Sequence, residues 1–97
     1  MAKLTTEAVQ EGLKELPGWN LKGEAISKQY TWPSFPEAIK FVNQVADLAE
    51  QADHHPDILI NYRRVTLTLS THSEGGLTRK DLDLAEKIEK EQSKQSG

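Results

Sequence analysis

Residues 34–72 read SFPEAIKFVNQVADLAEQADHHPDILINYRRVTLTLSTH, and within them the hydrophobic pattern changes from a helical period to a β period. Ser34 and Glu37 have the spacing of a capping box, and Pro36 lies in the first turn, where its missing amide donor costs little. Apolar residues then follow in two adjacent stripes at helical spacing, which predicts a helix with a broad buried face. Residues 53–56, Asp-His-His-Pro, end that helix.

Two β segments follow the helix. Residues 58–62 are a short strand-forming run, and residues 65–72 alternate between two faces. The connection between them lacks the glycine that favours two-residue hairpins, so the strands are better defined than their turn. If they pair as an antiparallel hairpin, His72 returns to the sheet edge that also holds His54 and His55. One face of the second segment carries Val65, Leu67, Leu69 and Thr71, and the other carries Thr66, Thr68, Ser70 and His72.

The flanking sequence completes one α+β domain. It predicts a helix over residues 5–16, strands over residues 19–22 and 25–32, and a last helix from Thr78 and Asp81 to about Glu91. The order α-β-β-α-β-β-α predicts a four-stranded antiparallel sheet with three helices packed on one face. We expect a single domain over residues 1–97, with a polar tail that frays over about residues 92–97.

Composition narrows the function classes. The chain has 97 residues and a net charge of −3, so it lacks the basic surface that nucleic-acid binding requires. It has no cysteine, which excludes disulfides and cysteine nucleophiles. It shows neither a membrane-spanning run nor a signal peptide, so we expect a soluble, cytoplasmic protein without membrane partners. A domain this small is often marginal alone, which favours a homo-oligomer.

All three histidines of the chain, His54, His55 and His72, fall at loop or strand-end positions. Imidazoles titrate near neutral pH, so a cluster of them suits general acid and base catalysis. The plainer alternative is that they are unrelated surface residues.

A metal site is a third interpretation. Two or three imidazoles with Asp53, Asp57 or Asp81 could ligate zinc or iron. Against it, adjacent side chains project in different directions, and there is no helical His-Glu-x-x-His spacing. Asp81 is more simply explained as a first-turn residue that complements the helix dipole. Tyr62 stays open, since its ring suits a strand and its hydroxyl could reach a site.

A fixed series of residues strengthens the catalytic interpretation. The series is Glu50, His54-His55-Pro56, Tyr62, His72 and Asp81. It resembles the signature of the pterin-4a-carbinolamine dehydratases, and the resemblance covers essentially the whole chain. It implies dehydration of 4a-hydroxytetrahydropterin to quinonoid dihydropterin and water, which recycles the pterin cofactor of aromatic amino-acid hydroxylases. It also implies homodimers or homotetramers, and neither a metal nor an organic cofactor.

The resemblance assigns roles to positions. His54, His55 and His72 match the family's catalytic histidines. Asp53 and the Ser70-Thr71 segment match places where, together with these histidines, the family's pterin lies against the protein.

One departure from the family concerns Ile58, where members from animals have a tryptophan. Its absence removes an aromatic wall without touching the acid–base groups. Members from animals also serve as dimerisation partners of a homeodomain transcription factor. A non-catalytic binding or assembly module on the same fold is therefore the alternative function.

Overall fold

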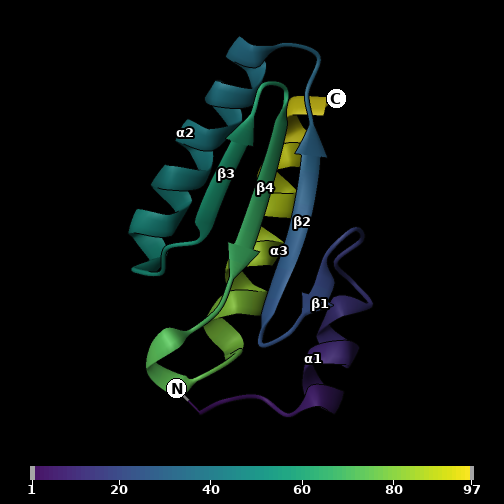
Figure 1. The fold of residues 1–97 in the computed structure, drawn as a ribbon, viewed down its shortest axis with the longest axis vertical. Helices are drawn as coiled ribbons and strands as arrows, with labels where there is room; N and C mark the ends of the chain where they lie inside the picture. Colours follow the sequence, from purple (N-terminus) through teal and green to yellow (C-terminus); the bar gives the residue numbers. More distant parts are fainter. Residues whose placement is uncertain (1, 97) are drawn as a thin grey trace.

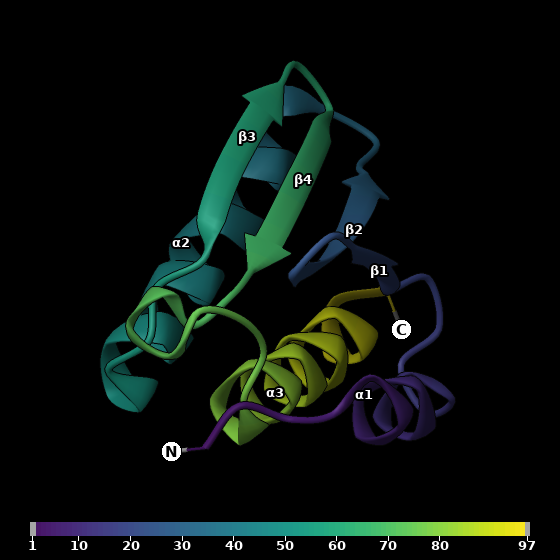
Figure 2. The ribbon, with the colours of Figure 1, turned by 60° about the horizontal axis from the view of Figure 1, so that its bottom comes forward.

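The computed structural model describes residues 2–96, and the side chains of residues 2–92. An antiparallel sheet of four strands has the order β1-β2-β4-β3, and the three helices lie on one of its faces (Figures 1 and 2). This confirms the predicted α+β class and element order. The elements are α1 (Thr6–Leu13), β1 (Asn20–Lys22), β2 (Ala25–Thr31), α2 (Phe35–Ala52), β3 (Asp57–Asn61), β4 (Arg64–Leu69), the 3-10 turn η1 (His72–Glu74) and α3 (Arg79–Ser96).

The ends of α2 follow from its sequence. Ser34 is the N-cap, and its hydroxyl accepts a hydrogen bond from the first turn, as the capping box predicts. At the other end Asp53 adopts a left-handed conformation with φ 50°. The N–H of Asp53 donates to Glu50 O at 3.2 Å and that of His54 to Ala49 O at 3.1 Å, which is a Schellman motif. This motif turns the chain out of the helix at His54.

The end of β4 differs from the prediction. The strand stops at Leu69 rather than at residue 72. Beyond it, Thr71 pairs with Gly76 as an isolated bridge, and η1 closes the loop between them. The Thr71 N–H donates to Gly76 O at 2.9 Å, so the backbone curls back on itself instead of continuing along β2. His72 therefore starts a 3-10 turn and does not end a strand.

Two helices also end at residues other than those predicted. α1 stops at Leu13 rather than at residue 16, because i→i+3 hydrogen bonds tighten the chain ahead of Pro17. α3 reaches Ser96, beyond the predicted Glu91, since no glycine or proline interrupts it. Fraying of residues 92–97 stays a prediction, and Gly97 lies outside the described residues. No helix within residues 2–96 is long and apolar enough to cross a membrane.

The alternation of β4 builds the core as predicted. Its apolar residues at alternate positions are fully buried beneath the helices, whereas the residues between them are not. Tyr30, Trp32 and Phe41 pack their rings together, with centroids of Phe41 4.7 Å from Tyr30 and 4.8 Å from Trp32. Trp19 and Trp32 are both buried in this core.

The register of the β3–β4 hairpin brings two loops to one end of the sheet. Asn61 pairs with Arg64 across a two-residue turn, and Asp57 pairs with Thr68. The α2–β3 loop and the β4–α3 loop therefore leave the sheet at the same end, where Figures 1 and 2 both place them side by side. The backbone therefore brings the two histidine-bearing segments to the same end of the sheet, as the sequence predicts.

Candidate active site

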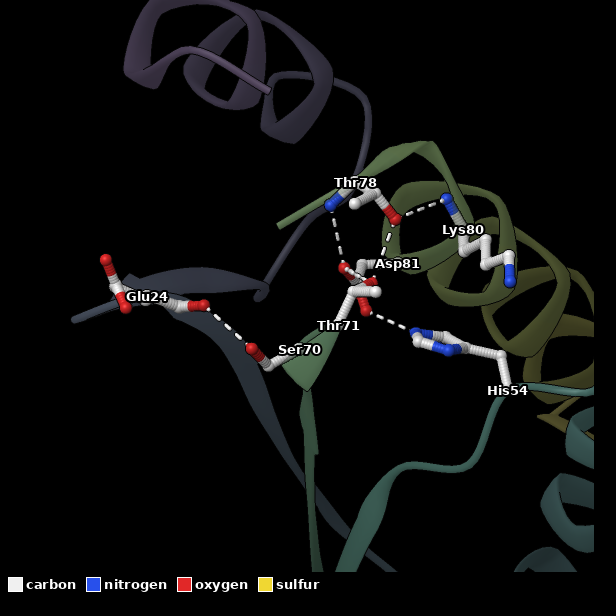
Figure 3. Close-up of polar contacts among 7 residues, drawn as sticks. All are labelled: Glu24, His54, Ser70, Thr71, Thr78, Lys80 and Asp81. Atoms are coloured by element: carbon white, nitrogen blue, oxygen red, sulfur yellow. Dashed lines mark hydrogen bonds and ion pairs between the residues drawn. The ribbon is translucent and has the colours of Figure 1, made fainter. Parts of the chain in front are cut away.

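A buried carboxylate lies at the centre of the site. The side chain of Asp81 is 0% exposed and contacts three neighbours (Figure 3). Its Oδ1 lies 2.5 Å from Nε2 of His54. Its Oδ2 accepts from the hydroxyl of Thr71 at 2.8 Å and from the N–H of Thr78 at 2.9 Å. These partners offset the cost of removing the carboxylate from water.

Separate elements deliver these groups. His54 follows the Schellman motif of α2, Thr71 follows β4, and Asp81 lies in the first turn of α3. Thr78 begins α3, since its hydroxyl accepts from the N–H of Lys80 at 3.3 Å and its own N–H bonds Asp81. The helix-start interpretation of Asp81 is therefore right but incomplete, because the same carboxylate also holds His54.

His54 is held at one nitrogen and open at the other. Its side chain is 10% exposed, and Nε2 faces Asp81. Within the described part of the chain Nδ1 makes no hydrogen bond, and it is not among the buried polar atoms that lack a partner. Nδ1 is thus not fully buried and has no partner among the described residues, so it is the ring nitrogen left for a ligand.

His55 lies in a different environment. Its Nε2 is 2.5 Å from Oε2 of Glu50, but the two side chains are 58% and 77% exposed. Water competes with an ion pair this exposed, so Glu50 orients His55 only weakly. The contact nevertheless gives Glu50, a member of the signature, a partner in the site region.

The side chain of His72 is exposed and, among the residues described, forms no hydrogen bond or ion pair; its carbonyl accepts from the N–H of Gly75 at 3.1 Å within η1. Its segment lies beside the α2–β3 loop (Figure 2). The structure therefore brings the backbones that carry the three histidines together. It does not join their side chains by any hydrogen bond within the described residues.

The other predicted site residues already serve the fold. Asp53 makes the left-handed turn after α2. The hydroxyl of Ser70 donates to the carbonyl of Glu24 at 3.0 Å, and Figure 3 shows it pointing away from His54. The Thr71 hydroxyl is engaged by Asp81. Of these three residues, only Thr71 shares a partner with His54.

Tyr62 and Ile58 lie on the same hairpin as the site. Tyr62 is in the turn at the far end from His54 and is 66% exposed, so within one chain its hydroxyl does not reach the site. Ile58, the departure from the family pattern, lies on β3 opposite Leu67 and is 36% exposed.

The described residues contain no group of three or more His, Asp or Glu side chains arranged to hold a metal. His54 contacts one carboxylate, that of Asp81. The second oxygen of that carboxylate already accepts hydrogen bonds from a threonine hydroxyl and a main-chain N–H. This arrangement does not match the three or four protein ligands of a zinc site.

Sequence reasoning missed the contact between Asp81 and His54 and the role of the Thr78 hydroxyl. The two partners of the contact are 27 positions apart, so no local pattern could reveal it. The one available signal was the place of Asp81 at the end of the signature.

The fold and the site together define a class: a small α+β protein in which a loop histidine contacts a buried carboxylate at one end of the sheet. The sequence model of the family described as pterin 4 alpha carbinolamine dehydratase matches residues 2–91. The chain therefore belongs to the pterin-4a-carbinolamine dehydratase family.

Relatives agree over nearly the full length. A protein of Roseiflexus castenholzii is 56% identical over 90 residues, covering 92% of this chain and 97% of its own. One of Thermomicrobium roseum is 49% identical, covering 91% and 95%. Both are named "Putative pterin-4-alpha-carbinolamine dehydratase".

Solved structures share the fold. A transcriptional coactivator/pterin dehydratase from Brucella melitensis superposes with a TM-score of 0.85 at 40% identity, covering 90% of this chain and 95% of that one. A pterin dehydratase-like RuBisCO assembly factor of the alpha-carboxysome superposes with a TM-score of 0.60 at 21% identity, covering 72% and 81%. The second likeness concerns the fold alone.

Proposed function

We propose that this chain is a dehydratase that converts 4a-hydroxytetrahydropterin to quinonoid dihydropterin and water. The observation that supports it best is the imidazole of His54, held by the buried Asp81 with its other nitrogen open, in a chain of this family. In the cell it would recycle the pterin cofactor of an aromatic amino-acid hydroxylase, in the cytoplasm. The proposed reaction needs proton transfer, and no metal or organic cofactor is assigned to it.

The proposed mechanism is an elimination assisted by histidines. A neutral imidazole removes the proton from N5 of the pterin, and the electron pair forms the C4a–N5 double bond. The C4a–O bond breaks, and the hydroxyl leaves as water with a proton from a second, charged imidazole. We assign the proton transfers to His54 and His72, and assign His55 to orienting the pterin. General acid and base catalysis of this kind contributes ~10²–10⁴-fold.

The proposed pterin contacts depend on which side-chain hydrogens are not already used in hydrogen bonds within the protein. The hydroxyl hydrogens of Ser70 and Thr71 are already donated to Glu24 and Asp81. Contacts of the pterin with these two positions, and with Asp53, would then use their accepting atoms or main-chain groups rather than those hydrogens.

A dehydratase assay tests the proposal. The carbinolamine is generated with phenylalanine hydroxylase, and its absorbance decay is followed above the uncatalysed background. We expect acceleration by the wild type that His72→Ala largely removes. Arg63→Ala, an exposed change at the far end of the hairpin, is the matched control and should keep full activity. No acceleration by folded wild type would sink the proposal.

We also propose that the chain works as a homodimer or homotetramer joined through β3. This strand is an edge of the sheet, with free main-chain groups along one side. Its apolar residues are exposed, at 36% for Ile58, 64% for Leu59 and 40% for Ile60. Pairing of β3 with β3 of a second copy would satisfy the main-chain groups and cover these side chains.

Sedimentation tests the assembly. We expect a dimer or tetramer for the wild type and a smaller species for Leu59→Lys. Asn20→Lys, on the opposite edge strand β1, is the control and should leave the assembly unchanged. A monomeric wild type at micromolar concentration would rule the assembly out.

A binding module is the second candidate function. The exposed apolar edge of β3 supports it, as does the coactivator role in the name of the Brucella relative. A stoichiometric protein partner that co-purifies equally well with wild type and with His54→Ala would favour this candidate over catalysis alone.

A further inference from the structure

We infer that Asp81 is a positioning residue that fixes the tautomer of His54, so that His54 meets its ligand through Nδ1. The catalytic meaning of this tautomer rests on the proposed function, because the tautomer specifies which nitrogen of His54 exchanges a proton with the pterin. Its structural basis is the set of hydrogen bonds drawn in Figure 3.

The direction of the hydrogen bonds around Asp81 follows from counting hydrogens. Thr71 has one hydroxyl hydrogen and donates it to Oδ2 of Asp81. In the 2.9 Å contact between the two threonine hydroxyls, Thr78 must therefore donate and Thr71 accept. The N–H of Thr78 gives Oδ2 a second donor. The carboxylate cannot rotate without breaking both bonds, so Oδ1 stays directed at His54.

Oδ1 in turn determines where the imidazole hydrogen sits. An ionised carboxylate only accepts, so the hydrogen between Oδ1 and Nε2 belongs to His54. A neutral imidazole carries one hydrogen, which leaves Nδ1 with a lone pair. The contact is nearly dry, with the side chains of Asp81 and His54 0% and 10% exposed, so water does not weaken this preference.

This tautomer assigns the base role. The lone pair on Nδ1 of neutral His54 accepts the N5 proton of the carbinolamine, and the resulting imidazolium is stabilised by Asp81 through Nε2. The acid that protonates the departing hydroxyl is then another group, and His72 is the histidine whose side chain makes no hydrogen bond or ion pair in the described chain. His55 is not fixed in this way, because its partner Glu50 is 77% exposed.

The test compares Asp81→Asn with wild type in protein labelled with ¹⁵N-histidine. Asparagine retains a carbonyl for the two donors at Oδ2 and presents its NH₂ to Nε2, which must then accept. Long-range ¹H–¹⁵N spectra, at a pH at which the imidazoles are neutral, should report Nε2–H for His54 in the wild type and Nδ1–H in the variant. The kcat for dehydration should fall ~10²-fold or more, with KM little changed.

A matched control separates positioning from helix capping. Ser34→Ala removes the N-cap of α2 and touches nothing in the site. It should lower the melting temperature but leave the His54 tautomer and kcat at wild-type values. If Asp81→Asn lowers only the melting temperature and leaves tautomer and kcat unchanged, Asp81 is a helix cap alone and the inference is overturned. Nδ1–H in the wild type would also overturn it.

The outcomes distinguish the inference from the proposed function. A wild type that shows Nε2–H yet does not accelerate dehydration contradicts the function and upholds the tautomer. An active wild type with the other tautomer contradicts the inference alone. Should Asp81→Asn fail to fold, Thr71→Val carries the test, because it removes one donor to Oδ2 and leaves the cap intact. For Thr71→Val we expect a mixture of His54 tautomers and about a tenfold lower kcat. A wild-type tautomer together with a wild-type kcat in this variant would overturn the inference.

Discussion

Asp81 in the first turn of α3 and Glu89 about two turns later are carboxylates shielded from solvent, Asp81 fully and Glu89 in part, yet their hydrogen-bond partners differ in kind. The Asp81 side chain is 0% exposed, and that of Glu89 is 17% exposed. Each accepts hydrogen bonds from residues distant in sequence. Among the partners of Asp81, the imidazole of His54 keeps one ring nitrogen without a hydrogen bond among the described residues. The partners of Glu89 donate all their side-chain hydrogens to other groups of the protein.

The Glu89 cluster uses all its donors internally. The ammonium of Lys28 donates to both oxygens of Glu89, at 2.8 and 3.0 Å, and to the carbonyl of Pro17 at 2.7 Å. The Tyr30 hydroxyl donates to Glu89, and Lys28 lies 4.7 Å from the centre of the Tyr30 ring. Burial, reinforced by Glu89, raises the pKa of Tyr30, so the phenol stays protonated as a donor. These contacts tie α3 to β2 and to the loop after α1.

The difference shows that burial of a carboxylate does not by itself mark a functional site. What distinguishes Asp81 is that its partner is an imidazole, which can both donate and accept a proton and whose Nδ1 has no hydrogen-bond partner among the described residues. Lys28 donates three hydrogen bonds inside the protein and has no hydrogen left to offer a ligand. We therefore expect changes in the Asp81 cluster to lower the dehydration rate, and changes in the Glu89 cluster to lower the free energy of unfolding.

The largest expected effect is on rate. His54→Ala should lower the dehydration rate ~10²–10⁴-fold, because it removes the proposed base. The matched change in the other cluster, Lys28→Met, should leave the rate of folded protein within about twofold, since Lys28 lies in the structural cluster. Single-turnover kinetics of both variants check this. Equal losses of rate would break the comparison.

The second effect is on stability. Lys28→Met should lower the free energy of unfolding by about 2 kcal/mol, because Glu89, whose side chain is only 17% exposed, is left without its counter-charge. Urea unfolding followed by circular dichroism measures this. Lys90→Met, which breaks the exposed pair with Glu86, is the control and should cost less than about 0.5 kcal/mol. Similar values for the two lysine variants would contradict the structural role of the Glu89 cluster.

The third effect appears at alkaline pH. Below pH 10.0, the ordinary pKa of tyrosine, the phenol of Tyr30 is protonated in the folded and unfolded chains alike, and its contribution to stability is complete. Above that pH the unfolded chain releases the proton and the folded chain keeps it. The free energy of unfolding should therefore fall by up to about 1.4 kcal/mol per pH unit.

Tyr30→Phe should remove this part of the slope, measured by urea unfolding at a series of alkaline pH values. Tyr62→Phe, which deletes an exposed phenol, should retain the wild-type slope. If Tyr30→Phe also retains it, the phenol does not donate to Glu89 in the folded protein.

The smallest expected effect belongs to the exposed pair of His55 and Glu50. Glu50→Gln should change the free energy of unfolding by less than about 1 kcal/mol, because both side chains are mostly in water. Thermal and urea unfolding at low and high salt check this value. A larger loss that persists at high salt would mean that this pair is buried in the assembled protein and belongs with the other two clusters.

The local structure could be read from the sequence because it depends on near neighbours. Ser34 capped α2 as its spacing predicts, and β4 buried alternate residues as its pattern predicts. Asp53 ended the helix, which located His54 and His55 in a loop. The signature added the family, with Asp81 as its last member. Each of these signals lies within a few residues or at fixed intervals along the chain.

The contacts that give these residues their roles were decided by the tertiary structure. His54 meets Asp81 across 27 positions, and Lys28 meets Glu89 across 61. The first contact exists because the loop after α2 lies against the start of α3, and the second because β2 packs against α3; nothing local to either residue encodes the partner. The sequence by itself therefore determined the elements and the candidate histidines. The packing of the elements decided which carboxylate holds an open imidazole and which one only holds the fold together.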